Sequence, residues 1–156
     1  MFTWLKKLFG MKTEPTILKG DGTWAFVVLV EGNDLVVRGA KATWFGGAND
    51  PQDNGETASG ISTSKRPEIL GCAIPMNFGP CKGSPIPRLP WGTKVEVTHT
   101  KSGKTITVPV IDLGPGRSTG NALDLTPAAF RQFAPLAVGK ITLDYRIPGA
   151  AKYLTA

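Results

Sequence analysis

The chain has little of what a metal centre or a nucleic-acid-binding face requires. Its 156 residues include one histidine and two cysteines, too few soft ligands for a typical zinc site, so we predict neither a metal nor a cofactor. Lysine and arginine never occur in runs longer than two, and no segment predicts a recognition helix with a basic face. We therefore expect no nucleic-acid partner. The net charge of +6 suits either an anionic polymer or an ordinary basic surface.

Long apolar runs are also missing. The longest, residues 24–30, holds seven apolar residues, whereas a membrane span needs about 20, so we expect no transmembrane span. Residues 1–11 place their lysines after apolar residues and lead to no small-residue cleavage site, so they predict no secretion signal. If this segment is helical, its apolar residues share one face: Phe2, Leu5, Leu8 and Phe9. Such a face is expected to pack on its own domain, or to dock on a membrane surface or a protein assembly partner.

The two cysteines, Cys72 and Cys81, are nine positions apart. In an oxidising compartment a disulfide between them would stabilise the fold by roughly 2–3 kcal/mol. In a reducing compartment the same residues would remain free thiols. The sequence leaves both states open.

A chain of this length fits one domain, and its 19 glycines and 13 prolines, with little helical periodicity, favour a loop-rich β protein. The run 24–30 predicts a buried strand that forms a hairpin with 35–38, and 40–45 predicts a third strand. Residues 46–65 are polar and rich in glycine, and they predict a long loop of the kind that carries function.

A strong period-two pattern follows in the second half of the chain. Residues 93–100 and 105–111 alternate around the turn 101–104, which predicts a β-hairpin. Its inward-facing residues are expected to be the following: Val95, Val97, Ile106, Val108 and Val110. His99 is expected to lie exposed at the strand end, whereas Trp91 is expected to pack.

Thr126 followed by Pro127 predicts the start of a short helix over 127–134, and residues 141–147 predict a closing strand. The fold class is therefore mainly β: a small six- or seven-stranded barrel with one short helix. Four parts are expected: an N-terminal amphipathic segment and linker (1–16), an N-terminal β extension (17–39), the barrel domain (40–148) and a C-terminal tail (149–156).

Two aspartates and an aromatic pair stand out as candidate functional residues. Asp112 and Asp124 each lie among apolar, strand-forming residues, and carboxylic acids supply the general acid that cleaves glycosidic bonds. Trp44 and Phe45 precede two glycines and offer aromatic faces for sugar rings. The structural alternative is that the aspartates hold turns by accepting backbone N–H bonds, and that one of the two aromatic residues faces the core.

These segments resemble the double-psi β-barrel proteins of the rare lipoprotein A type, which are related to expansins and to some lytic transglycosylases. The resemblance covers roughly residues 40–147 and rests on five segments in order: Ala42-Thr43-Trp44-Phe45-Gly46, Thr57-Ala58-Ser59-Gly60, Leu89-Pro90-Trp91-Gly92-Thr93-Lys94-Val95, Val110-Ile111-Asp112-Leu113-Gly114-Pro115 and Ala122-Leu123-Asp124-Leu125-Thr126. It implies a double-psi-like barrel. It also implies catalytic roles for Asp112 and Asp124 and substrate binding by Thr43, Trp44, Phe45 and Ser59. Ile61 stands where the family commonly has an acidic residue.

The resulting hypothesis is a peptidoglycan-active domain that cleaves glycan strands by lytic transglycosylation or hydrolysis. A peptidoglycan or related polysaccharide would be its partner, at the cell wall or in the periplasm. The alternatives are a non-catalytic wall-binding module and a structural component of a phage tail or similar assembly. Acidic residues also occur in the glycine-rich loop, at Asp50, Asp53 and Glu56, where a solvated loop is favoured over a calcium site or an acid role.

Overall fold

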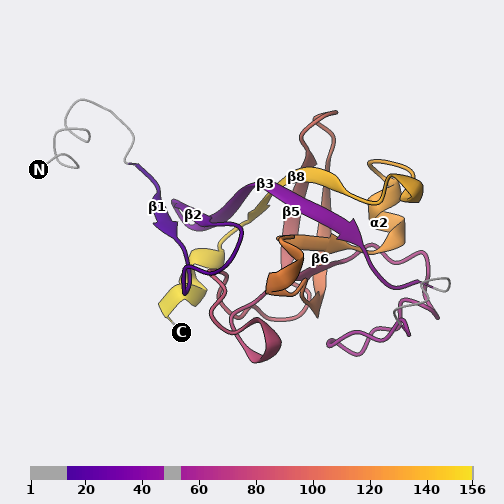
Figure 1. Ribbon diagram of the computed structural model, residues 1–156, viewed down its shortest axis with the longest axis horizontal. Coiled ribbons are helices and arrows are strands. Elements are labelled where there is room, and N and C mark those ends of the chain that lie inside the picture. Colours follow the sequence, from indigo (N-terminus) through magenta and orange to yellow (C-terminus); the bar gives the residue numbers. More distant parts are fainter. Residues whose placement is uncertain (1–13, 48–53, 156) are drawn as a thin grey trace, which may run out of the picture.

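The computed structural model describes residues 14–47 and 54–155 (Figure 1). Residues 1–11, with their proposed docking face, and Asp50 and Asp53 lie outside the described residues. No helix within the described part is both long and apolar enough to cross a membrane.

A closed six-stranded β-barrel forms the body of the molecule. Its strands follow the order β3 (Asp34–Trp44), β7 (Leu123–Leu125), β4 (Cys72–Ile74), β6 (Thr105–Leu113), β5 (Lys94–His99) and β8 (Ile141–Ile147), and β8 pairs back onto β3. Two further strands, β1 (Thr16–Leu18) and β2 (Val28–Glu31), extend the sheet beside β3. The β3–β7 and β4–β6 pairs are parallel. The predicted fold class, a small mainly β barrel, is confirmed.

The remaining elements are short and surround the barrel. They are one α-helix, α2 (Pro127–Arg131), and the 3-10 helices η1 (Gly79–Cys81), η2 (Arg117–Thr119), η3 (Leu136–Val138) and η4 (Ala150–Thr155). The helix begins as predicted, because the Thr126 side chain accepts a hydrogen bond from the Ala129 N–H and proline occupies the first helical position. It ends at Arg131, three residues before the predicted end.

Alternating side chains of the barrel strands fill the core. Val95, Val97, Val108 and Val110 are all fully buried, and Ile106 is half-buried against them, so the predicted β5–β6 hairpin and its inward face are confirmed. Strand β8 coincides with the predicted closing strand, and its odd-numbered residues are buried throughout.

Strand β3 is one continuous strand, where the sequence analysis predicted two. Its pairing with β8 shifts between Val37 and Ala40. At this β-bulge Gly39 adopts a φ of +65° and donates its N–H to the Asp144 carboxylate at 2.8 Å. A positive φ suits glycine, which has no Cβ. Since residues 35–37 already pair with β8, the barrel wall reaches back beyond residue 40.

The prediction of a strand over 24–30 is wrong in its first half, because β2 begins at Val28. Trp24 instead packs edge-on against Phe26, with ring centroids 6.2 Å apart, and the Arg117 guanidinium lies 5.4 Å from its ring. This packing buries the tryptophan although residue 24 does not belong to a strand. Ala25 and Val27 of the same run are exposed, so this half of the run is not a buried strand.

Two further predictions are corrected by burial. His99 is buried rather than exposed, because its ring lies 5.6 Å from that of Phe133 and its Nδ1 lies 3.0 Å from the Ser102 Oγ. Trp91, expected to pack, is 39% exposed.

Both cysteines are buried free thiols. Burial raises the pKa of each thiol, and that of Cys72 most strongly, so neither is reactive at neutral pH. We expect a thiol reagent to label neither residue in the native protein. In denaturant without reductant it should label two thiols per chain. Complete absence of labelling in denaturant, reversed by a reductant, would instead demonstrate a disulfide.

Candidate functional site

The two candidate catalytic aspartates lie on either side of one small residue in the barrel wall. Ala73 of β4 pairs with Asp112 of β6 and with Asp124 of β7. Asp124 also pairs with Thr43 of β3. Paired residues on neighbouring strands project from the same face of a sheet. The four residues therefore form a line, Asp112–Ala73–Asp124–Thr43, which we call the aspartate row. It lies on the face opposite the core, because the residues that flank Asp124 belong to the core.

Asp124 is held by a short chain of hydrogen bonds. The Thr43 hydroxyl donates to Asp124 Oδ1 at 2.6 Å, and the Thr43 N–H approaches the same oxygen at 3.4 Å. The Thr43 hydroxyl oxygen accepts a hydrogen bond from Asn121 Nδ2 at 3.4 Å. This chain engages one carboxylate oxygen of Asp124 and fixes the orientation of the side chain.

Burial raises the pKa of Asp124 above its ordinary value of 3.8. The hydrogen bonds from Thr43 oppose this effect, the negative charge of Asp112 adds to it, and the positive charge of Lys140 reduces it. The net shift favours the protonated acid, as a general acid requires.

The raised pKa predicts how stability depends on pH. Because the folded state binds the Asp124 proton more tightly than the unfolded state, this group stabilises the fold most below pH 3.8. That contribution is lost as the pH rises through the folded-state pKa. The side chain at position 124 of the variant Asp124→Asn cannot ionise, so the variant does not lose this contribution. The melting temperature of the variant minus that of the parent should therefore rise between about pH 3.5 and pH 7, the range over which carboxyl groups titrate.

Asp34→Asn provides a control of opposite sign. The Gly149 N–H and then the Arg146 guanidinium lower the pKa of Asp34, so its contribution is present at neutral pH and is lost as the pH falls. The melting temperature of Asp34→Asn minus that of the parent should therefore fall as the pH rises. Identical trends for the two variants would contradict the assigned shifts.

Asp112 is held by the loop that precedes β4. Its Oδ1 accepts the N–H of Ala58 at 2.9 Å and that of Leu113 at 2.9 Å. The N–H of Ser59 donates to the carbonyl of Ile111 at 3.2 Å, so this turn lies against β6 beside Asp112. The Ser59 hydroxyl lies 3.0 Å from that of Thr57 within the turn. The structure thus places Ser59 near Asp112, and Thr43 against Asp124.

The aromatic pair lies at the end of β3, next to Thr43. Trp44 packs against the core and donates its Nε1–H to the Leu136 carbonyl at 3.1 Å. It also lines a small cavity of about 100 Å³ together with Gly46, Gly47 and Arg131. Phe45 is half-buried, and its N–H donates to the Leu125 carbonyl at 2.9 Å. Trp44 is therefore anchored at both its ring and its indole N–H.

Three residues of this region did not emerge from the sequence as site residues. Ala73 separates the aspartates, Asn121 orients Thr43, and Lys140 acts on Asp124 through its charge. Asn121 is 6% exposed, and its Oδ1 is one of two buried side-chain polar atoms without a hydrogen-bond partner in the described part. Its position just before the Asp124 segment was the only available signal.

No group of three or more metal-ligating side chains occurs among residues 14–47 and 54–155. Of the three loop acids, only Glu56 is described. It is exposed, and its N–H donates to the Asn54 side chain at 2.9 Å within the loop.

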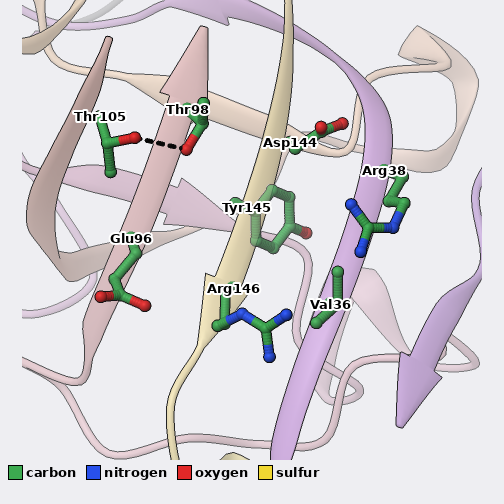
Figure 2. Close-up of a pocket in the computed structure, with 8 residues that line it drawn as sticks. All are labelled: Val36, Arg38, Glu96, Thr98, Thr105, Asp144, Tyr145 and Arg146. Atoms are coloured by element: carbon green, nitrogen blue, oxygen red, sulfur yellow. Dashed lines mark hydrogen bonds between the residues drawn. The ribbon is translucent and has the colours of Figure 1, made fainter. Parts of the chain in front are cut away.

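A separate polar pocket of about 340 Å³ crosses the outer face of β3, β8, β5 and β6 (Figure 2). Arg146 reaches from this pocket to Glu31 and Asp34, at 2.9 Å each, and Arg38 lies 3.3 Å from Glu31. These contacts connect β8 to the strands at the start of the barrel. Because the guanidinium groups already pair with carboxylates, we assign them a structural role.

Comparison with known proteins gives similarity to solved structures but no family. No protein-family model matches the chain, and no curated protein matches it. Among solved structures it is similar to the Streptomyces papain inhibitor, with 29% identity and a TM-score of 0.48, over 74% of this chain and 96% of that chain. We assign no family from this similarity.

Proposed function

We propose that the chain is a peptidoglycan-active domain that cleaves glycan strands with Asp124 as the general acid. The observation that supports this is the aspartate row: a carboxyl group whose pKa is raised by burial, oriented by Thr43 and followed by a second carboxylate on the same face. In glycoside cleavage, two carboxyl groups in different surroundings commonly act as the proton donor and as its charged partner.

The chemistry requires one proton donor and one nucleophile. The protonated Asp124 would donate to the glycosidic oxygen as the bond from that oxygen to the anomeric carbon breaks. In lytic transglycosylation a hydroxyl of the muramic acid ring then attacks the anomeric carbon, and its proton returns to the carboxylate. In hydrolysis a water molecule attacks instead, and Asp112 would accept its proton.

Two strand spacings of about 4.8 Å separate the Cα atoms of Asp112 and Asp124, so these atoms lie roughly 10 Å apart. Retaining enzymes bring their carboxyl groups to about 5–5.5 Å, whereas inverting enzymes keep them about 6.5–9.5 Å apart. Side chains on Cα atoms at this separation reach either distance, so the cleavage products distinguish the routes.

The test is incubation of the protein with purified peptidoglycan, followed by mass analysis of the soluble products. Anhydro-muramic ends would support lytic transglycosylation, and new reducing ends would support hydrolysis. Release of no product at any pH between 4 and 8, the range in which general acids are commonly tuned, would refute the catalytic proposal.

One observation favours a second candidate, a non-catalytic wall-binding module. Asp112 accepts two backbone N–H groups, as an aspartate that holds a turn does. If the parent releases no product but sediments with intact peptidoglycan, the binding module is the better description.

A further inference from the structure

A large groove lies beside the aspartate row, between the β5–β6 turn and the segment that follows α2. Its volume is about 770 Å³. Residues 99–102 form one wall, and residues 133–135 with Val138 form the other. Lys140 and the first two residues of β8, Ile141 and Thr142, contribute to the lining. Both the turn and α2 can be followed in Figure 1.

Specific contacts fix the two walls relative to each other. The His99 ring packs on Phe133, and its Nδ1 lies 3.0 Å from the Ser102 hydroxyl. Lys104, in the same turn, donates from Nζ to the side-chain oxygen of Gln132 at 3.3 Å. The groove is therefore built into the fold.

The lining combines apolar surface with positive charge. Phe133, Val138 and Ile141 provide apolar side chains, and Val138 is 55% exposed. Lys101 and Lys140 line the groove, and among residues 14–47 and 54–155 no aspartate or glutamate does. Lys41 adds a third ammonium group at the edge, where its Nζ donates to the Thr142 hydroxyl at 2.9 Å. Such a surface is complementary to a ligand that carries both a carboxylate and short alkyl groups.

Lys140, which lines the groove, also lies next to the aspartate row. Ile141 of β8 pairs with Ala42 of β3 in antiparallel orientation. Lys140, which precedes Ile141, and Thr43, which follows Ala42, are therefore neighbours at that end of the β3–β8 pair. Thr43 contacts Asp124 directly. The influence of the Lys140 charge on Asp124 agrees with this proximity.

We propose that this groove binds the acidic side group of a glycan that lies across the aspartate row, with its carboxylate at Lys101 and Lys140 and its alkyl groups on Phe133 and Val138. The inference rests on the proposed function and names its substrate class: a glycan with carboxylate-bearing lactyl or peptide arms, as muramic acid carries. A neutral polymer of N-acetylglucosamine leaves the lysines without a partner, so it is the poorer ligand.

The test measures binding in the Asp124→Asn background, in which the glycan is not consumed. Calorimetry would compare soluble muramic acid-containing glycan fragments with N-acetylglucosamine oligomers of equal length. We expect the acidic fragments to bind at least about tenfold more tightly, and the double variant Lys101→Gln/Lys140→Gln to remove about that factor. Its affinity for the neutral oligomers should not change.

Two controls complete the test. In the same background, the double variant Lys19→Gln/Lys82→Gln removes the same charge from exposed positions outside the groove, and it should bind both ligands as Asp124→Asn alone does. Val138→Gln should weaken the acidic fragments alone, because it makes the apolar surface polar. Equal affinity for the two glycans, or equal losses in the two lysine pairs, would overturn the proposal. Cleavage by the parent tests the proposed function separately, since these binding measurements need no turnover.

Discussion

Replacing Asp124 by asparagine is expected to reduce the rate of glycan cleavage by on the order of 10²–10⁴, the usual effect of losing a general acid. The amide keeps the size of the side chain and can still accept the Thr43 hydroxyl, which now donates to Asp124 Oδ1 at 2.6 Å. It has no acidic proton to give to the leaving oxygen. The rate of product release from peptidoglycan, measured at equal concentrations of folded protein, checks this expectation.

Two companion variants interpret the result. Asp112→Asn should also be slow if water is the nucleophile, and close to the parent if the substrate's own hydroxyl attacks. Glu96→Gln changes a half-buried carboxyl group in the pocket of Figure 2, away from the aspartate row, and should leave the rate unchanged. Normal cleavage by folded Asp124→Asn would rule out Asp124 as the acid.

Truncating Phe130 to alanine should produce the largest loss of stability, about 3–5 kcal/mol. Phe130 lies on α2 and is fully buried in the core, and α2 packs against β3 and β7, the strands that carry Thr43 and Asp124. At about 2–4 °C for each kcal/mol in a domain of this size, the melting temperature should fall by roughly 6–20 °C. Thermal unfolding followed by circular dichroism measures the change.

Ile17→Ala is the exposed control for this prediction. Ile17 is 54% exposed on β1, so its truncation should change the free energy of unfolding by less than about 0.5 kcal/mol. A similar, small change in both variants would mean that α2 does not pack on the barrel as described.

The sequence predicted those elements that local patterns determine. The β5–β6 hairpin, the start of α2 and strand β8 each follow from alternation or capping within about ten residues. The sequence also singled out Asp112 and Asp124 as candidate functional residues, because each is a carboxyl group among apolar, strand-forming residues. These are short-range signals, and the structure retains them.

The arrangement of the candidate site depends on pairings between distant segments. Ala73 lies between Asp112 and Asp124 only because β4 pairs in parallel with β6 and antiparallel with β7, and no local pattern encodes such a crossover. His99 shows the same limit. Its burial depends on Phe133, which is 34 positions away.

The bulge in β3 determines which side of the barrel wall each residue of that strand occupies. If Gly39 continued the regular ladder after Val37, every later residue would change sides, so that Thr43 would point into the core and Ala42 outward. The extra residue is absorbed opposite Asp144, so the core-facing residues of β3 change from odd-numbered before the bulge (Leu35, Val37) to even-numbered after it (Ala40, Ala42). Loss of residue 39 would therefore preserve the outward face of β3, whereas one more insertion in a regular part of the strand would move Thr43 away from Asp124. The bulge is a point where the chain tolerates a change of length without a change of site.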